Sequence, residues 1–111
     1  MDLLLQDHVA IVTGSSRGLG LASAMALVQE GCHVTVAARG AETLERAAGE
    51  LRARAAYGAQ VLAVPADLST PAGVDEVVAK TVAEFDGLDV LVNNIGLGRG
   101  ATIVDTDDAT W

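Results

Sequence analysis

The chain has 111 residues, of which 50% are hydrophobic and 20% are charged, a composition typical of one globular domain. Its formal net charge of −8 argues against nucleic acid as a partner, because binding to a phosphate backbone needs a basic surface. No apolar run approaches the roughly 20 residues of a membrane span, so we expect no membrane partner. The single cysteine, Cys32, allows no disulfide framework, so we expect a cytoplasmic protein.

The first part of the chain alternates strand and helix patterns. Residues 8–13 (HVAIVT) form an apolar run rich in β-branched residues, which predicts a buried strand. An Ala- and Leu-rich helix is predicted over residues 18–30, and Gly31 stands where helices favour a glycine cap. The same alternation then predicts a strand over 33–38, a helix over 42–56 and a strand over 60–64.

The third helix has the clearest amphipathic pattern in the chain. Thr70 and Pro71 form its start signal, a hydroxyl N-cap followed by proline at the first helical position. Its apolar residues, at helical spacing, are Val74, Val77, Val78, Val82 and Phe85. We expect Gly87 to end this helix and residues 88–92 (LDVLV) to form a fourth strand, followed by a glycine-containing loop and a helix start within 105–111.

Strands that alternate with helices at this rhythm predict a parallel sheet with helices on both faces. The fold class is therefore α/β, a doubly wound, Rossmann-like parallel sheet. The chain carries its N-terminal β-α-β-α-β-α-β portion in three α/β/α layers. Because no long linker or low-complexity tract interrupts the pattern, we expect residues 1–111 to form one domain.

Residues 13–20 (TGSSRGLG) join the first strand to the first helix through a glycine-rich turn. The N-terminus of a helix presents unpaired N–H groups and the positive end of its dipole to an anion, and glycine lets the backbone approach phosphate closely. The general dinucleotide pattern G-x-G-x-x-G would need glycine where Ser23 stands. A P-loop would need lysine and a hydroxyl residue where Leu21 and Ala22 stand.

The spacing T-G-x-x-x-G-x-G, with Gly14, Gly18 and Gly20, resembles the short-chain dehydrogenase/reductase family in its compact single-domain branch. Residues 93–96 (NNIG) are similar to the N-N-A-G motif of that family, with Ile95 in place of the usual small residue. The resemblance covers the whole chain. It implies the N-terminal, cofactor-binding half of such an enzyme, within a sheet of strand order 3-2-1-4-5-6-7.

The resemblance and the turn together give the expected cofactor contacts. These are Gly14, Ser15, Ser16, Arg17, Gly18, Leu19 and Gly20 in the turn, and Arg39, Asp67, Leu68, Asn93, Ile95 and Gly96 elsewhere. In the family, an Asp at the position of Asp67 meets the adenine ring, and the N-N-A-G motif stabilises the central sheet and borders the cofactor. The family's catalytic Ser, Tyr-x-x-x-Lys pair and helix-four Asn all lie downstream of the position of Trp111, so no catalytic residue is assigned here.

The end of the second strand distinguishes the two nicotinamide cofactors. Dehydrogenases that prefer NAD usually carry an acidic residue there, which bonds the ribose hydroxyls. This chain instead has Arg39 after two alanines, and arginine binds a 2′-phosphate bidentately. Arg17 in the glycine turn can reach the same corner. We therefore predict NADP(H), with NAD(H) less favoured; the alternative is that both arginines are solvated surface residues.

Three other polar or reactive residues are not assigned to the site. Cys32 is expected to be a small buried side chain, because nothing in the sequence indicates an electropositive surrounding for a reactive thiol. His8 and His33 each begin a strand and are expected to be structural or solvated. We therefore predict no metal site.

The leading hypothesis is the cofactor-binding portion of an NADP(H)-dependent oxidoreductase, which transfers a hydride between the nicotinamide and a carbonyl or alcohol substrate, as a ketoreductase does. Its parent protein is expected to be longer and homo-oligomeric, a dimer or tetramer, and this chain alone is expected to be inactive. The alternative is a noncatalytic nucleotide-binding or assembly module that is complete at this length. A methyltransferase-like domain is less favoured, because no acidic residue closes the second strand.

Overall fold

The computed structural model describes residues 6–14 and 18–93, and every structural statement below concerns these residues. They form a four-stranded parallel sheet of order β3-β2-β1-β4. In chain order the elements are β1 (Val9–Thr13), α1 (Gly18–Gln29), β2 (His33–Ala38), α2 (Ala41–Arg54), β3 (Val61–Pro65), α3 (Pro71–Phe85) and β4 (Val90–Asn93). The predicted Rossmann-like α/β fold is confirmed.

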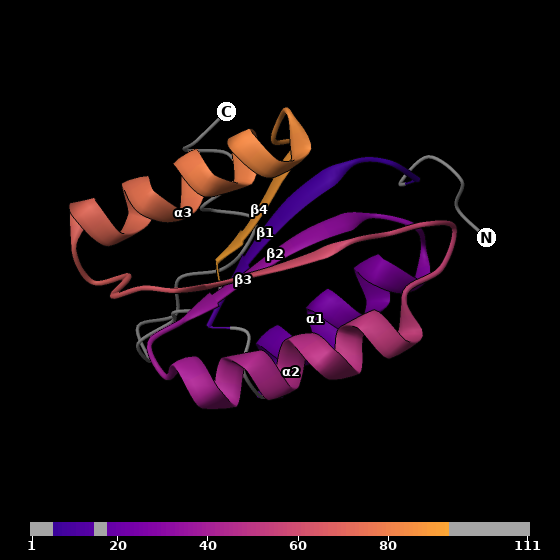
Figure 1. The fold of residues 1–111 in the computed structure, drawn as a ribbon, viewed down its shortest axis with the longest axis horizontal. Coiled ribbons are helices and arrows are strands. Elements are labelled where there is room, and N and C mark those ends of the chain that lie inside the picture. Colours follow the sequence, from indigo (N-terminus) through magenta and orange to yellow (C-terminus); the bar gives the residue numbers. More distant parts are fainter. Residues whose placement is uncertain (1–5, 15–17, 94–111) are drawn as a thin grey trace.

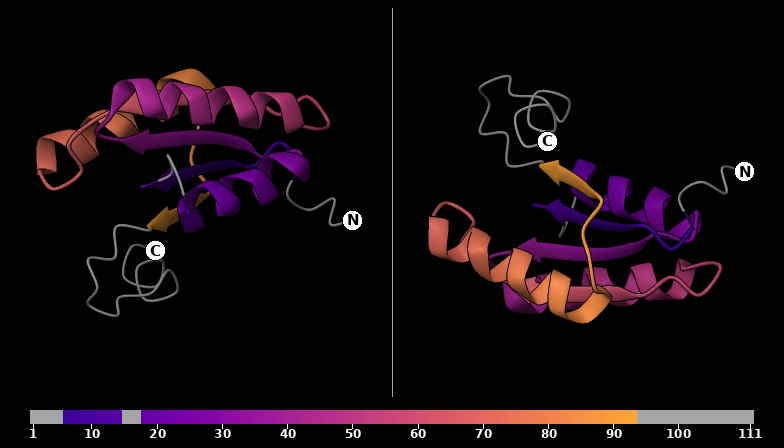
Figure 2. Two further views of the ribbon diagram at one scale, coloured as in Figure 1. Left: turned by 90° about the horizontal axis from the view of Figure 1, so that it is seen from below. Right: turned by 90° about the horizontal axis from the view of Figure 1, so that it is seen from above.

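The helices cover the two faces of the sheet unequally. Figure 1 shows α1 and α2 together on one face and α3 on the other, and the views along the sheet in Figure 2 show the same three layers. The chain crosses from one face to the other between α2 and α3. Helix α3 then leads from β3, at one edge of the sheet, to β4, which pairs with β1 on the side away from β2, with Ala10 opposite Val90 and Thr13 opposite Asn93. The predicted three-layer arrangement is thus present.

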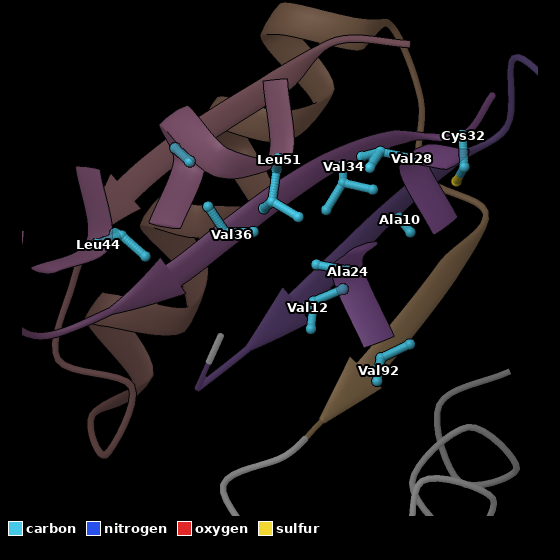
Figure 3. Packing of buried hydrophobic residues seen from close by; sticks show 11 residues of the cluster. Ala10, Val12, Ala24, Val28, Cys32, Val34, Val36, Leu44, Leu51 and Val92 are labelled. Atoms are coloured by element: carbon cyan, nitrogen blue, oxygen red, sulfur yellow. The ribbon is translucent and has the colours of Figure 1, made fainter. Parts of the chain in front are cut away.

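The core lies mainly between the sheet and the pair α1 and α2. Figure 3 shows this cluster, which contains Ala10, Val12, Ala24, Val28, Cys32, Val34, Val36, Leu44, Leu51 and Val92. A smaller cluster on the other face contains Ile11, Ala37, Val64 and Val77. Successive residues of β1 therefore point into different clusters, which is why the whole strand is buried and is apolar up to Thr13. Full burial of each valine, leucine or isoleucine contributes about 1.5–3 kcal/mol.

Helix α3 does not bury the whole apolar stripe that its sequence predicts. Val77 is 2% exposed, whereas Val74, Val78 and Val82 are 43%, 37% and 43% exposed. The positions that face the sheet are Gly73, Val77 and Thr81, which are four residues apart. Two of these three are not apolar side chains, so hydrophobic periodicity did not identify the buried face.

A buried hydroxyl pair joins α3 to the sheet. Thr81 and Thr35, both fully buried, form a hydrogen bond with 2.8 Å between their Oγ1 atoms. The Thr81 hydroxyl also lies 2.7 Å from the carbonyl oxygen of Val77. Each buried hydroxyl is thereby satisfied within the helix–sheet contact, which removes the desolvation penalty of an unpaired polar group.

The ends of two helices test the predicted glycine caps. Gly31 has a φ of +89° and follows α1, where the Cys32 N–H donates to the Leu27 carbonyl at 3.1 Å, as in a Schellman motif. This cap is confirmed. The cap predicted at Gly87 is wrong by one residue, because Asp86 takes the left-handed conformation (φ +64°) and donates its N–H to Val82.

Most other bounds differ from the predictions by one or two residues. Helix α2 ends at Arg54 rather than at residue 56. Strand β4 begins at Val90 rather than at residue 88, because Asp89 bonds the start of β1 through its side chain. Its Oδ2 accepts the Val9 N–H at 2.8 Å, and its own N–H donates to the Val9 carbonyl at 2.8 Å. The loop and helix start predicted after residue 94 lie outside the described residues.

None of the helices in the described part of the chain has the length and apolar character needed to cross a membrane.

Candidate functional site

The first residues of the two motifs, Thr13 and Asn93, lie opposite each other at the carboxyl edge of the sheet. The chain adds β2 and then β3 on one side of β1 and adds β4 on the other side, so the direction in which strands are added reverses at β1. In open α/β sheets, ligands bind at such a switch point, outside the carboxyl ends of the strands. Thr13 at the end of β1 donates its hydroxyl to Oδ1 of Asn93 at the end of β4, at 2.9 Å. The first residues of the two motifs are thereby joined.

The glycine turn has the backbone conformation that its glycines predict. Gly14 and Gly18 have φ values of +61° and +63°, a region that residues with a β-carbon rarely adopt. Gly20 is buried in the first turn of α1, and Leu19 beside it is exposed. The first turn of α1 contains no acidic residue, so no carboxylate there neutralises the positive end of the helix dipole. Ser15, Ser16 and Arg17 lie outside the described residues.

An open pocket of about 280 Å³ lies beside this turn, at the carboxyl ends of β2 and β3. It is lined by Gly14, Ala38, Arg39, Ala66, Asp67, Leu68 and Ser69. Two backbone hydrogen bonds hold lining residues in place. The Gly14 N–H donates to the Ala37 carbonyl at 2.9 Å, and the Ala66 N–H donates to the Ala38 carbonyl at 3.0 Å. Four of the predicted contacts, Gly14, Arg39, Asp67 and Leu68, are thus brought to one cavity.

The pocket has apolar walls and a charged rim. Ala38, Ala66 and Leu68 provide the apolar part, and the last two also pack against the smaller core cluster. On the rim, Nη1 of Arg39 lies 3.9 Å from Oδ1 of Asp67. The Arg39 side chain is 75% exposed and that of Asp67 is 49% exposed. Solvent screens such a pair strongly, so Arg39 is available to another anion.

The carboxylate of Asp67 is bonded chiefly by Ser69. Its Oδ1 accepts the Ser69 hydroxyl at 2.6 Å and the Ser69 N–H at 3.0 Å. These two hydrogen bonds, the hydroxyl bond first, lower the pKa of Asp67, and the charge of Arg39 lowers the pKa slightly further. Asp67 is therefore ionised at neutral pH and can only accept hydrogen bonds.

The turn that carries Asp67 is tied to the start of α3 by residues that sequence reasoning did not assign to the site. The Thr70 hydroxyl donates to the Asp67 carbonyl at 3.0 Å and accepts the Gly73 N–H at 3.0 Å. Thr70 is thus the N-cap that the sequence predicts. A β-carbon on Gly73 would collide with the carbonyl group of Asp67. Ser69 and Gly73 had no motif to identify them, because their roles depend on how this turn packs.

Two residues that the sequence left outside the site, Cys32 and His33, pack within the fold. Cys32 is buried, and burial, with a smaller contribution from Asp89, raises the pKa of its thiol to about 11. The Nδ1 atom of His33 accepts the Gln60 N–H at 3.0 Å, and its ring stacks on Phe85 with 5.4 Å between centroids. Within residues 6–14 and 18–93, no group of three or more His, Cys, Asp or Glu side chains could hold a metal ion.

Predicted contacts near the second motif are only partly described. Asn93 ends β4 and bonds Thr13, beside the glycine turn. Ile95 and Gly96 lie outside the described residues.

Comparison with known proteins identifies the family. The family model for short chain dehydrogenases matches residues 8–111. The 2,3-dihydro-2,3-dihydroxybenzoate dehydrogenase of Bacillus subtilis is 32% identical over 107 residues, which are 96% of this chain and 40% of that protein. The chain spans about two fifths of the length of the curated relatives it matches.

Solved structures agree with this result. The L-sorbose reductase of Gluconobacter frateurii, complexed with NADPH and L-sorbose, superposes with a TM-score of 0.81 and is 42% identical, covering 100% of this chain and 41% of its own. An NAD⁺-bound xylitol dehydrogenase superposes with a TM-score of 0.72 and is 28% identical, covering 78% of this chain and 32% of its own. The chain belongs to the short-chain dehydrogenase family.

Proposed function

We propose that this chain is the cofactor-binding portion of an NADP(H)-dependent oxidoreductase, which transfers a hydride between the nicotinamide and a carbonyl or alcohol substrate. The observation that carries the cofactor assignment is Arg39, whose exposed guanidinium stands on the rim of the pocket directly after β2. Residues 1–111 are proposed to be one NAD(P)-binding domain. When bound, the cofactor supplies or accepts the hydride.

Each part of the dinucleotide has a proposed position. The pyrophosphate lies over the glycine turn, where Gly14, Gly18 and Gly20 let the backbone approach it and the N-terminus of α1 attracts its charge. Ser15, Ser16, Arg17 and Leu19 are proposed to line the same turn. The adenosine end enters the pocket, with Asp67 and Leu68 beside the base and Arg39 beside the ribose. Asn93, Ile95 and Gly96 are proposed to border the nicotinamide end.

The residue after β2 determines which cofactor is preferred. The fold by itself does not, because the solved relatives include one complexed with NADPH and one bound to NAD⁺. An acidic residue at this position would repel a 2′-phosphate, whereas Arg39 can form two parallel hydrogen bonds with it. Its partner in the structure, Asp67, forms only a long, solvent-exposed ion pair, which a phosphate can replace.

Substitution of Arg39 tests this assignment. We expect isothermal titration calorimetry to show tighter binding of NADPH than of NADH by the unmodified protein, by about tenfold or more. Arg39→Asp should weaken NADPH binding by at least that factor and leave NADH binding almost unchanged or improved. Arg54→Asp, at the far end of α2, makes the same change of charge away from the pocket and should preserve the preference. Tighter NADH binding by the unmodified protein would contradict the proposal.

The catalytic acid and base are proposed to come from outside these 111 residues. The sequence contains one tyrosine, Tyr57, and the fourth residue after it is Val61 rather than a lysine. A parent protein that carries the family's Ser, Tyr and Lys should consume NADPH only when a carbonyl substrate is added. Its homo-oligomeric state and its cytoplasmic location remain predictions from the sequence.

A further inference from the structure

The carboxylate of Asp67 is held through only one of its two oxygens. Oδ1 accepts the Ser69 hydroxyl at 2.6 Å and the Ser69 N–H at 3.0 Å, and it is also the oxygen nearest to Arg39. Among the described residues, no donor bonds Oδ2. Asp67 therefore lines the pocket with an acceptor oxygen to which no described residue donates.

The Ser69 hydroxyl restricts the carboxylate more than the turn alone requires. A backbone N–H bonded to the side chain two residues earlier is sufficient to close a turn of this kind. Here the hydroxyl of the same residue adds a second and shorter bond to the same oxygen. Two donors from one residue restrict rotation about the side-chain bonds of Asp67, so that Oδ2 is held in place before a ligand binds.

The residue that positions Asp67 is itself fixed to the fold. Ser69 lies between Asp67 and Thr70, and Thr70 bonds both the Asp67 carbonyl and the Gly73 N–H at the start of α3. The contact of Gly73 with the Asp67 carbonyl group leaves no room for a side chain between helix and turn. The position of Oδ2 is therefore set by α3, through a turn of four residues.

The shape and lining of the pocket suit a flat ring that lies beside Oδ2 of Asp67. Its apolar walls, Ala38, Ala66 and Leu68, suit the faces of an aromatic base, and its volume of about 280 Å³ is at the lower limit for small-molecule sites. An ionised carboxylate can only accept hydrogen bonds, so it binds a base that presents an N–H donor at its edge. A base with a carbonyl oxygen at that place would present a second acceptor and be repelled.

We infer that Ser69 is a positioning residue that sets the base selectivity of this site, by holding Oδ2 of Asp67 as the acceptor for the exocyclic amino group of a 6-aminopurine. The inference rests on the proposed function, since it concerns the adenine end of the same dinucleotide. It goes beyond the presence of Asp67, because it requires that the carboxylate also be held in position. Without the Ser69 hydroxyl the carboxylate remains, but the site discriminates less between a base with a 6-amino group and one without.

The experiment compares NADPH with its hypoxanthine analogue, in which a carbonyl oxygen replaces the 6-amino group and N1 of the base carries a hydrogen, while the riboses, phosphates and nicotinamide are unchanged. Titration calorimetry of the unmodified protein should give a preference for NADPH of about tenfold. In Ser69→Ala the dissociation constant for NADPH should rise about fivefold, while that for the analogue changes less than about twofold. Ser69→Thr, which retains a hydroxyl, should keep most of the preference.

A merely structural role for Ser69 predicts a different result. Loosening of the turn would weaken both dinucleotides by the same factor and leave their ratio unchanged, and that outcome would overturn the inference. Ser23→Ala, in α1 and away from the pocket lining, is the matched control and should leave both constants unchanged. If the unmodified protein binds neither dinucleotide, the cofactor proposal is wrong as well; if it binds both equally, only the role of Ser69 is wrong.

Discussion

At the scale of single residues, the ionisation of Asp67 can be measured without any ligand. Two Ser69 hydrogen bonds lower its pKa, and Ser69→Ala removes the hydroxyl bond, which is the larger cause, so the pKa should rise toward the usual value near 4. A carboxyl whose pKa is lowered by folding stabilises the protein at pH values above its unfolded pKa, and this contribution is lost as the pH falls through the folded pKa. Ser69→Ala should therefore be less stable than the unmodified protein at neutral pH, with the difference vanishing at strongly acidic pH.

A titration followed by NMR of the side-chain carboxyl carbons gives the Asp67 pKa in both proteins. An Asp67 pKa that is equal in the two proteins would contradict the Ser69 hydrogen bonds.

The residues of the pocket differ in how far sequence could identify them. Arg39 was predicted because it directly follows the second strand, and Asp67 because the family resemblance implies an adenine-contacting Asp after the third strand. The carboxyl ends of these parallel strands meet at one edge of the sheet. Ser69 was not predicted, although it is only two residues from Asp67. Its role depends on a hydroxyl reaching one particular carboxylate oxygen, and that geometry is a property of the folded turn.

At the scale of elements, the start of α3 depends on Gly73, although alanine has the higher helix propensity. Gly73→Ala should lower the free energy of unfolding by about 1–3 kcal/mol, because a β-carbon there meets the Asp67 carbonyl group and the helix must shift. Gly49→Ala is the matched control: Gly49 is exposed within α2, and its β-carbon would meet no atom within 4 Å. This change should raise the free energy of unfolding by about 0.5–1 kcal/mol.

Urea denaturation of the two variants and the unmodified protein measures both changes. The free energy of unfolding should fall in Gly73→Ala, which reports the steric contact, and rise in Gly49→Ala, which reports the general preference of helices for alanine. If Gly73→Ala were as stabilising as Gly49→Ala, the close contact between α3 and the turn would be wrong.

The elements also show why the spacing of apolar residues identifies the buried face of α2 but not that of α3. The buried residues of α2, Leu44, Ala47, Ala48 and Leu51, are those that helical spacing of apolar residues indicates. In α3 the sheet is met by Gly73, Val77 and Thr81, and the buried hydroxyl of Thr81 is satisfied by Thr35 from β2. That pairing joins residues 46 positions apart, so no local pattern could predict it.

At the scale of the whole molecule, the order of the strands was more predictable than their ends. Short connections and right-handed crossovers leave few arrangements for four parallel strands and three helices. The bounds of β4 depended instead on Asp89, whose side chain bonds the first residue of β1 from 80 positions away. Long-range hydrogen bonds of this kind are invisible to periodicity, and they decide where a strand begins.

The same arrangement predicts how stability is distributed over the sheet. Strands β1 and β2 each pair on both sides, whereas β3 and β4 are the edges of the sheet formed by the described residues. Only alternate N–H groups of an edge strand point into the sheet, so the others exchange with solvent more readily. Hydrogen exchange followed by NMR should therefore show the slowest amides throughout β1 and β2, and an alternation of slow and fast amides along β4. Uniformly slow exchange along β4 would contradict this expectation and would mean that a further segment pairs with its outer edge.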